Sequence, residues 1–166
     1  MNRRDALALP EFAQWSREIW APYLQSALVS IGILSDTFET SCPWAAFSSL
    51  HQAVVGAVTE ALLSECGGGV VSCRFTHVYA DGPAPYYTFL GPAHVGRERA
   101  QWRAIKDAAC RALAEHGGTI THHHAVGRTH VDGYQREVPQ LMRAGLAAVK
   151  QAWDPQHLMN PGVLGL

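Results

Sequence analysis

Apolar residues recur along the chain at two spacings, which predict an alternation of helices and strands. Steps of three and four residues predict helices, because they bring apolar side chains onto one helix face. Helices are expected at residues 10–31, 43–66 and 97–116, and a last helix carries Pro139 in its first turn and runs to residue 153. Runs of β-branched and aromatic residues predict strands at residues 34–42, 70–79, 85–90 and 119–121.

A turn joins two of these strands. Asp81, Gly82 and Pro83 separate residues 70–79 from residues 85–90, which is typical of a β-hairpin. Helices lie between strands in each half of the chain. The pattern therefore predicts an α+β fold, in which an antiparallel sheet has its helices packed mainly on one face in a ferredoxin-like arrangement.

Each expected helix has one apolar stripe that should face the interior. In residues 43–66 the stripe consists of Phe47, Leu50, Val54, Val58, Ala61 and Leu62. In residues 97–116 it consists of Trp102, Ile105, Ala109 and Leu113. In the last helix it consists of Leu141, Gly145, Val149 and Trp153.

Length and composition limit the classes of protein that need to be considered. The 166 residues suffice for one domain with a core, and the net charge of −1 gives no electrostatic footprint for nucleic acid. No apolar run approaches the ~20 residues that span a membrane. The four cysteines form no CxxC pair, and the N-terminus has no signal core. We therefore expect reduced cysteines and a cytoplasmic location.

Three consecutive histidines, His122, His123 and His124, stand between two glycine-containing turns. If the segment continues as a strand, His122 and His124 share one face and His123 takes the other. Surface or capping histidines, a ligand or catalytic site, and a metal site all remain open at this point. No HExxH or Cys/His spacing supports the metal interpretation, so we assign no metal ligand.

Two further polar features lie in the predicted hairpin. Arg74 and His77 are embedded in what reads as an inner strand, where a charge needs a partner such as Asp36 or Glu39. The neighbouring Tyr86 and Tyr87 should point to opposite faces of the returning strand, one of them into the core.

Four segments, taken together and in this order, resemble the C-terminal half of the FAD-linked oxidase family. They read SDTFETSCPW, CRFTHVYADGPAPYYTF, GGTITHHHAVG and WDPQHLMNPGVL. The triple histidine resembles the sequence of the alkyldihydroxyacetonephosphate synthase branch at this position. The lactate and glycolate oxidase branch carries Glu-His-Gly there.

The resemblance implies that residues 1–166 form a single C-terminal substrate (cap) domain, and that the FAD-binding domain is absent from this chain. It implies FAD in the intact enzyme, with none bound by the chain alone. The implied reaction replaces the acyl group of acyl-dihydroxyacetone phosphate by a fatty alcohol in ether-lipid synthesis. The implied partners are a lipid phosphate substrate and a separate FAD-binding domain. By itself the chain should be inactive.

The resemblance also implies roles for individual residues. Tyr86, His123 and His124 match catalytic positions. Arg74, His77 and His122 match substrate-binding positions. His124 and Asn160 match positions near the cofactor.

Two departures from the family pattern keep other functions open. The FAD-binding half that the resemblance implies is absent from this chain, and Gln25 replaces a family arginine. Ala125 in place of a family glycine is a smaller change. One alternative is the cap domain of an FAD-linked 2-hydroxy acid oxidase or dehydrogenase. Another is a non-catalytic binding or assembly module. In each case the face that meets a flavin domain should be an exposed apolar patch, which favours a homo-oligomer.

Overall fold

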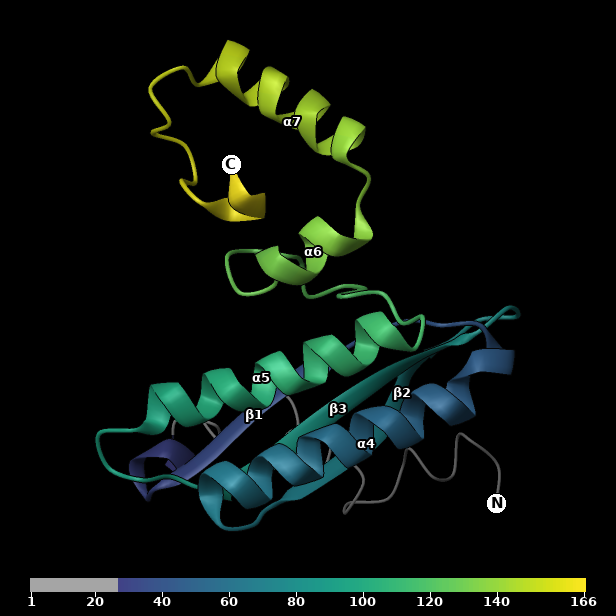
Figure 1. The fold of residues 1–166 in the computed structure, drawn as a ribbon, viewed down its shortest axis with the longest axis vertical. Helices are drawn as coiled ribbons and strands as arrows, with labels where there is room; N and C mark the ends of the chain where they lie inside the picture. Colours follow the sequence, from purple (N-terminus) through teal and green to yellow (C-terminus); the bar gives the residue numbers. More distant parts are fainter. Residues whose placement is uncertain (1–26) are drawn as a thin grey trace, which may run out of the picture.

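The computed structural model describes residues 27–166, which form a three-stranded sheet with two long helices on one face (Figure 1). The elements in chain order are β1 (Ile33–Glu39), α4 (Trp44–Cys66), β2 (Val70–Val78), β3 (Pro83–Pro92), α5 (Glu98–Glu115), α6 (Val131–Glu137), α7 (Gln140–Trp153) and the short 3₁₀ helix η1 (Val163–Gly165). Most of the helix predicted at residues 10–31, together with Gln25, lies outside the described residues.

The strands have the order β1-β3-β2, and both outer strands are antiparallel to β3. Strands β1 and β2 are therefore parallel to each other and are connected through α4, as in a split βαβ unit. The predicted α+β class with an antiparallel sheet is confirmed. The prediction that β2 is an inner strand is wrong, because β3 occupies the centre and β2 lies at an edge.

The predicted fourth strand at residues 119–121 is not a strand. The backbone amide of Thr119 donates to the carbonyl of Ser41 at 3.1 Å. Ser41 lies just after β1, so this bond resembles the first hydrogen bond of a strand pairing. The pairing stops there, because the amide of Ile120 and those of His122 to His124 donate to carboxylate side chains instead.

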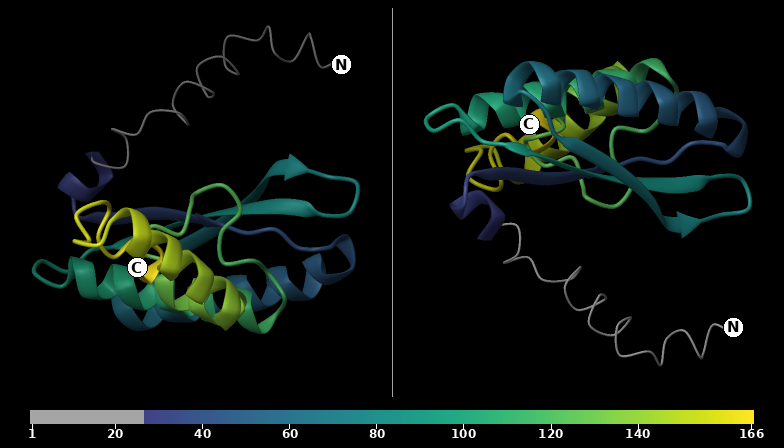
Figure 2. Two further views of the ribbon diagram at one scale, coloured as in Figure 1. Left: turned by 90° about the horizontal axis from the view of Figure 1, so that it is seen from above. Right: turned by 90° about the horizontal axis from the view of Figure 1, so that it is seen from below.

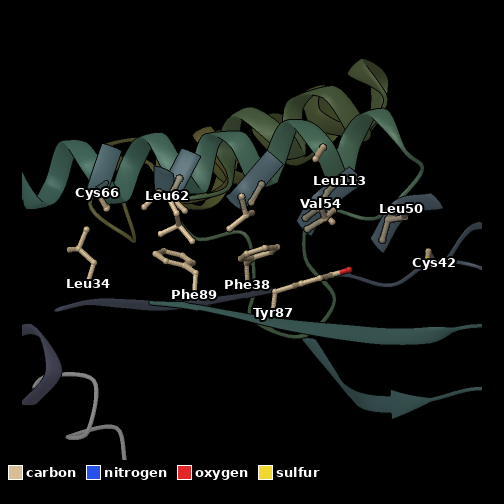
Figure 3. Close-up of a cluster of buried hydrophobic side chains, with 14 residues drawn as sticks. Leu34, Phe38, Cys42, Leu50, Val54, Leu62, Cys66, Tyr87, Phe89 and Leu113 are labelled. Atoms are coloured by element: carbon tan, nitrogen blue, oxygen red, sulfur yellow. The ribbon is translucent and has the colours of Figure 1, made fainter. Parts of the chain in front are cut away.

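The core lies between the sheet and the pair α4 and α5 (Figures 2 and 3). On β1 and β3 the side chains of Phe38, Tyr87 and Phe89 point toward the helices, and the rings of Phe38 and Tyr87 stack at 4.9 Å. From α4 the core receives Leu50, Val54, Val58, Leu62 and Cys66, at three- and four-residue steps. Each large side chain buried here contributes roughly 1.5–3 kcal/mol of transfer free energy. The predicted stripe of α4 is thus largely confirmed, with Phe47 and Ala61 only partly buried.

Glycines permit two sharp changes of direction at the ends of α4. Gly67 has φ 74° and donates its amide to the carbonyl of Leu63, and the amide of Gly68 donates to the carbonyl of Leu62, which caps the helix. At Gly82 in the hairpin turn, any Cβ would collide with the backbone of Cys42. Gly82 lets the hairpin turn close against the start of α4.

The C-terminal part stands away from the sheet in Figure 1. The predicted last helix corresponds to α7, with Pro139 immediately before its first residue. The short helix α6 precedes it and was not predicted, and the backbone is extended at Val138 and Pro139 between the two helices. Helix α7 has no buried residue, so the prediction that Leu141, Val149 and Trp153 face the interior is wrong for the described chain. Within residues 27–166 no helix combines the length and apolar character needed to cross a membrane.

Candidate functional site

The triple histidine lies on a loop that is held by one buried carboxylate. Glu39 is the last residue of β1, and its side chain is fully buried. Its Oε1 accepts the backbone amides of His122, His123 and His124 at 2.7, 2.8 and 2.9 Å. It also accepts the hydroxyl of Thr121 at 2.7 Å. Four donors on one oxygen fix the backbone of the loop and place its three rings.

This hydrogen bonding also fixes the charge of Glu39. Burial raises the pKa of the carboxyl, but the amides of the loop and the Thr121 hydroxyl stabilise the ionised form and lower the pKa to about 2. The second oxygen, Oε2, lies 3.1 Å from Nδ1 of His123 and 3.7 Å from Nδ1 of His122. A negative charge is therefore present beneath the histidine loop at neutral pH.

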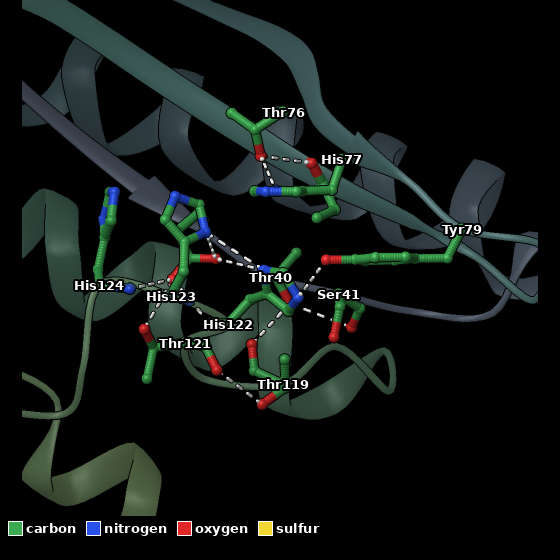
Figure 4. A network of polar contacts seen from close by, with 12 residues as sticks. Thr40, Ser41, Thr76, His77, Tyr79, Thr119, Thr121, His122, His123 and His124 are labelled. Atoms are coloured by element: carbon green, nitrogen blue, oxygen red, sulfur yellow. Dashed lines mark hydrogen bonds and ion pairs between the residues drawn. The ribbon is translucent and has the colours of Figure 1, made fainter.

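The rings of His122 and His123 face His77 of β2, and Tyr79 follows β2 on the same side (Figure 4). His122 contacts the Tyr79 hydroxyl through Nε2 at 3.2 Å, and its ring meets that of His77 with centroids 5.4 Å apart. His123 lies between its two neighbours. The expectation that His122 and His124 share one strand face is wrong, because the segment is a loop.

Tyr86 is where β3 meets this loop. Tyr86 and Tyr87 point to opposite faces of β3 as predicted, with Tyr87 in the core. The hydroxyl of Tyr86 donates to Oγ1 of Thr37 at 3.0 Å. The ring centroid of His124 lies 5.2 Å from that of Tyr86, and that of His123 lies 6.2 Å from it. The structure thus brings the three predicted catalytic residues together.

Arg74 joins the same face of the sheet. Its guanidinium lies 4.7 Å from the centroid of the Tyr86 ring, a cation–π contact. Arg74 and His77 are both exposed, since β2 is an edge strand. The predicted ion pairs with Asp36 or Glu39 are wrong. Asp36 pairs with Lys106 at 3.3 Å, and Glu39 is occupied by the histidine loop.

The imidazole of His124 favours its neutral form. Burial lowers its pKa below the ordinary value, and the opposing attraction of Glu39 does not reverse the shift. A neutral imidazole has one donor and one acceptor nitrogen, so it can both take and give a proton near neutral pH. Beside a phenol such as Tyr86, this pairing is suited to proton transfer.

A cavity of about 860 Å³ opens on the other side of His122. Its lining includes Tyr79, Asp81, Arg136 and Glu137, so it lies between the hairpin turn and α6. Glu137 bounds it by accepting the hydroxyl of Thr119 at 2.7 Å.

Asn160 lies in the exposed C-terminal turn with φ 47°. The structure ties this turn to the segment that follows the histidines: Nε of Arg128 donates to the carbonyl of Pro161 at 2.8 Å, and the amide of Leu164 donates to the carbonyl of Gly127 at 3.0 Å. These contacts join the C-terminal turn that contains Asn160 to residues 127 and 128, and a role of Asn160 near a cofactor stays a prediction.

Sequence reasoning missed Glu39 as the residue that organises the site. The only available signal was an acid within a β-branched and aromatic run, which indicates a strand end that meets polar groups. The loop partner is more than 80 positions away and could not be inferred from spacing.

These features define a cap-type α+β domain with an aromatic and imidazole site on its open sheet face. The family described as FAD linked oxidases, C-terminal domain, matches residues 3–164, and the chain belongs to this family.

Its sequence is similar to alkyldihydroxyacetonephosphate synthases. The synthase of Trypanosoma brucei brucei is 27% identical over 143 residues, which are 86% of this chain and 23% of the synthase. The synthase of Dictyostelium discoideum is 22% identical over 140 residues, 84% of this chain and 23% of the synthase. A solved structure of an alkyldihydroxyacetonephosphate synthase superimposes with a TM-score of 0.63 at 17% identity, covering 89% of this chain and 24% of the other. The chain therefore spans about a quarter of the length of these relatives.

Proposed function

We propose that residues 1–166 form the substrate domain of a flavoenzyme that exchanges the acyl group of acyl-dihydroxyacetone phosphate for a fatty alcohol. The observation that carries the proposal is the juxtaposition of Arg74, Tyr86 and His124 on one open face of the sheet. A cation, a phenol and a neutral imidazole are the groups that a phosphate-bearing ketone substrate requires. The similarity to alkyldihydroxyacetonephosphate synthases supports the same reaction.

Arg74 is assigned to the phosphate. Arg74 is exposed, and its guanidinium lies over the Tyr86 ring, so its donors remain available to an anion approaching from solvent. Guanidinium groups match phosphate oxygens with paired donors, which a single ammonium does not. In this proposal, a phosphate bound by Arg74 brings the ketone end of the substrate next to Tyr86 and His124.

Tyr86 and His124 are assigned to proton transfer. The Tyr86 hydroxyl is oriented by Thr37, and the His124 backbone is fixed by Glu39. Removal of a proton from the carbon beside a ketone needs a base at a fixed position, and an imidazole beside a phenol fulfils this need. His123 and His122 complete the polar wall, with His77 at its exposed rim.

FAD is the cofactor that the family implies for the intact enzyme. The rings of His123, His124 and Tyr86 are clustered on the open face, where a planar group carried by another domain has access. When bound there, FAD would supply the electrophilic ring system that this chain's side chains lack. The chain's own residues would bind the phosphate, orient the ketone and move the proton.

A binding titration tests the assignment on this chain. Dihydroxyacetone phosphate, added to ¹⁵N-labelled protein, is expected to shift the amide signals of Arg74, Tyr86 and His124 in a saturable manner. Arg74→Gln should weaken this binding about tenfold or more, as the loss of a charged hydrogen-bond partner predicts. Arg97→Gln is the matched control, because Arg97 lies at the other end of the sheet and pairs with Glu65. Equal affinity in both variants would contradict the assignment.

A further inference from the structure

The second carboxylate oxygen of Glu39, Oε2, faces two imidazole nitrogens. Within the described residues its Oε2 is buried and accepts no hydrogen bond. Nδ1 of His123 lies 3.1 Å from it, and Nδ1 of His122 lies 3.7 Å from it. The two Nδ1 atoms are 3.2 Å apart. Three potential ligand atoms thus form a small triangle beneath the histidine loop.

We propose that these three atoms bind a divalent transition-metal ion of the zinc class. Ligand atoms at 2.0–2.1 Å from a tetrahedral ion are separated from one another by about 3.3 Å. The three separations in the triangle lie on both sides of this value. An ion that enters the triangle needs only small side-chain shifts to reach all three atoms.

Hydrogen bonds around the triangle hold the ligands in the required form. Nε2 of His122 contacts the Tyr79 hydroxyl at 3.2 Å, and a proton on Nε2 leaves Nδ1 with a free lone pair. Oε1 of Glu39 is saturated by four donors from the loop, which leaves Oε2 for the ion. Ligands oriented by such outer contacts are characteristic of protein metal sites.

His77 is the candidate for a fourth ligand, on the exposed side of the loop. One ring nitrogen from each of His77, His122 and His123 can be chosen so that all three lie within 4.8 Å of one another. Nδ1 of His77 contacts Oγ1 of Thr76 at 3.2 Å, so its Nε2 is the nitrogen available for binding. Because His77 is exposed, it also marks the path by which an ion enters from solvent.

The donor set selects the chemical class of the ion. Two or three imidazoles with one carboxylate suit zinc and its neighbours, whereas magnesium and calcium prefer oxygen ligands. The charge also fits, since an ion between the Nδ1 atoms balances the buried carboxylate of Glu39.

The inference does not depend on the proposed function. It uses only the loop and the ends of β1 and β2, and Tyr86 and His124 remain outside the ligand set. With an ion bound, His123 would present its second ring nitrogen as a donor only, which leaves His124 as the base.

The experiment is a metal titration of the full chain, produced without a polyhistidine tag and stripped with a chelator. Zn²⁺ is titrated by calorimetry, Co²⁺ by its visible absorption, and Mg²⁺ serves as the control ion. We expect one Zn²⁺ per chain, a tetrahedral Co²⁺ spectrum and no Mg²⁺ binding. Glu39→Gln, His122→Asn and His123→Asn should each weaken Zn²⁺ binding at least tenfold, and His77→Asn should weaken it less.

His124→Asn separates this site from casual binding by a run of histidines. The proposed site keeps its affinity in that variant, whereas an exposed triple-histidine site loses affinity equally at all three positions. Equal losses at His122, His123 and His124, or no stoichiometric Zn²⁺ binding by the parent chain, would overturn the proposal. If Glu39→Gln fails to fold, the two histidine variants and the Co²⁺ spectrum still decide the question.

Discussion

Thr121 and Glu39 are 82 positions apart in the sequence, yet the hydroxyl of Thr121 lies 2.7 Å from Oε1 of Glu39. The same oxygen also receives the backbone amides of the next three residues. This single carboxylate connects the end of the first strand to the candidate site, and its ionisation links the site to the stability of the fold.

The first prediction concerns acid stability. The pKa of Glu39 falls from 4.5 to about 2 on folding, so its contribution is fully present above pH 4.5 and is lost as the pH falls toward 2. A difference of this size corresponds to about 3 kcal/mol of unfolding free energy. Urea unfolding in the presence of a chelator should show this loss in the parent chain and not in Glu39→Gln. Glu60→Gln, on the exposed side of α4, should behave as the parent does.

His130 should make the free energy of unfolding depend on pH at higher pH values than Glu39 does. Burial is the largest cause of its lowered pKa, and Nδ1 lies 3.8 Å from Sγ of Cys110. The unfolded chain takes up the proton more readily, so stability should decrease as the pH falls below about 6.5, by at most about 1.4 kcal/mol per pH unit. Unfolding measured between pH 7.5 and 5.5 should show a flatter profile in His130→Gln than in the exposed control His94→Gln. Identical slopes in the two variants would be inconsistent with this account.

Tyr86→Phe tests the proton-transfer role. The variant loses one hydrogen bond to Thr37, which should cost about 1 kcal/mol of stability. In the assembled flavoenzyme, exchange of labelled fatty alcohol should fall by about 10²–10⁴-fold. Thr37→Val is the matched control, because it removes the same hydrogen bond and keeps the phenol. A similar loss of exchange activity in both variants would mean that the hydrogen bond to Thr37, and not proton transfer by the phenol, is what the reaction requires.

Phe89→Ala tests the core between β3 and the helices. The ring is fully buried, so its removal should lower the free energy of unfolding by about 3–5 kcal/mol. Val95→Ala changes a side chain that is 98% exposed and should stay within about 0.5 kcal/mol of the parent. Denaturant unfolding monitored by circular dichroism measures both. A small effect at Phe89 would place the core elsewhere.

The exposed apolar side of α7 should promote self-association. Leu141 and Trp153 are 86% and 85% exposed. Large exposed apolar patches usually mark surfaces that contact another molecule. Sedimentation velocity should show concentration-dependent association of the parent chain, and Leu141→Gln combined with Trp153→Gln should reduce it. A parent chain that remains monomeric at high concentration would refute the prediction.

The long elements could be predicted because their patterns are local. The stripe of α4 and the turn at Gly82 are visible within short windows, and both are present in the structure. The segment at residues 119–121 could not be assigned correctly. Its composition favours a strand, but side-chain carboxylates receive the amides that a strand would need.

The sequence allowed several residues of the candidate site to be predicted, but it did not allow their contacts to be predicted. Tyr86, His123 and His124 are brought together as the family resemblance implied. Arg74 was expected to be buried beside an acid, and it is exposed beside Tyr86 because β2 is an edge strand. Strand order depends on contacts between distant residues, which a single sequence does not display.

The anchoring of the histidine loop has a consequence for redesign. Glu39 holds residues 122–124 through backbone amides, a group that every amino acid except proline possesses. The three ring positions can therefore be exchanged for other side chains while the loop keeps its path. Other side chains can therefore be introduced at residues 122–124 to change the chemistry of the candidate site without changing the backbone that carries it.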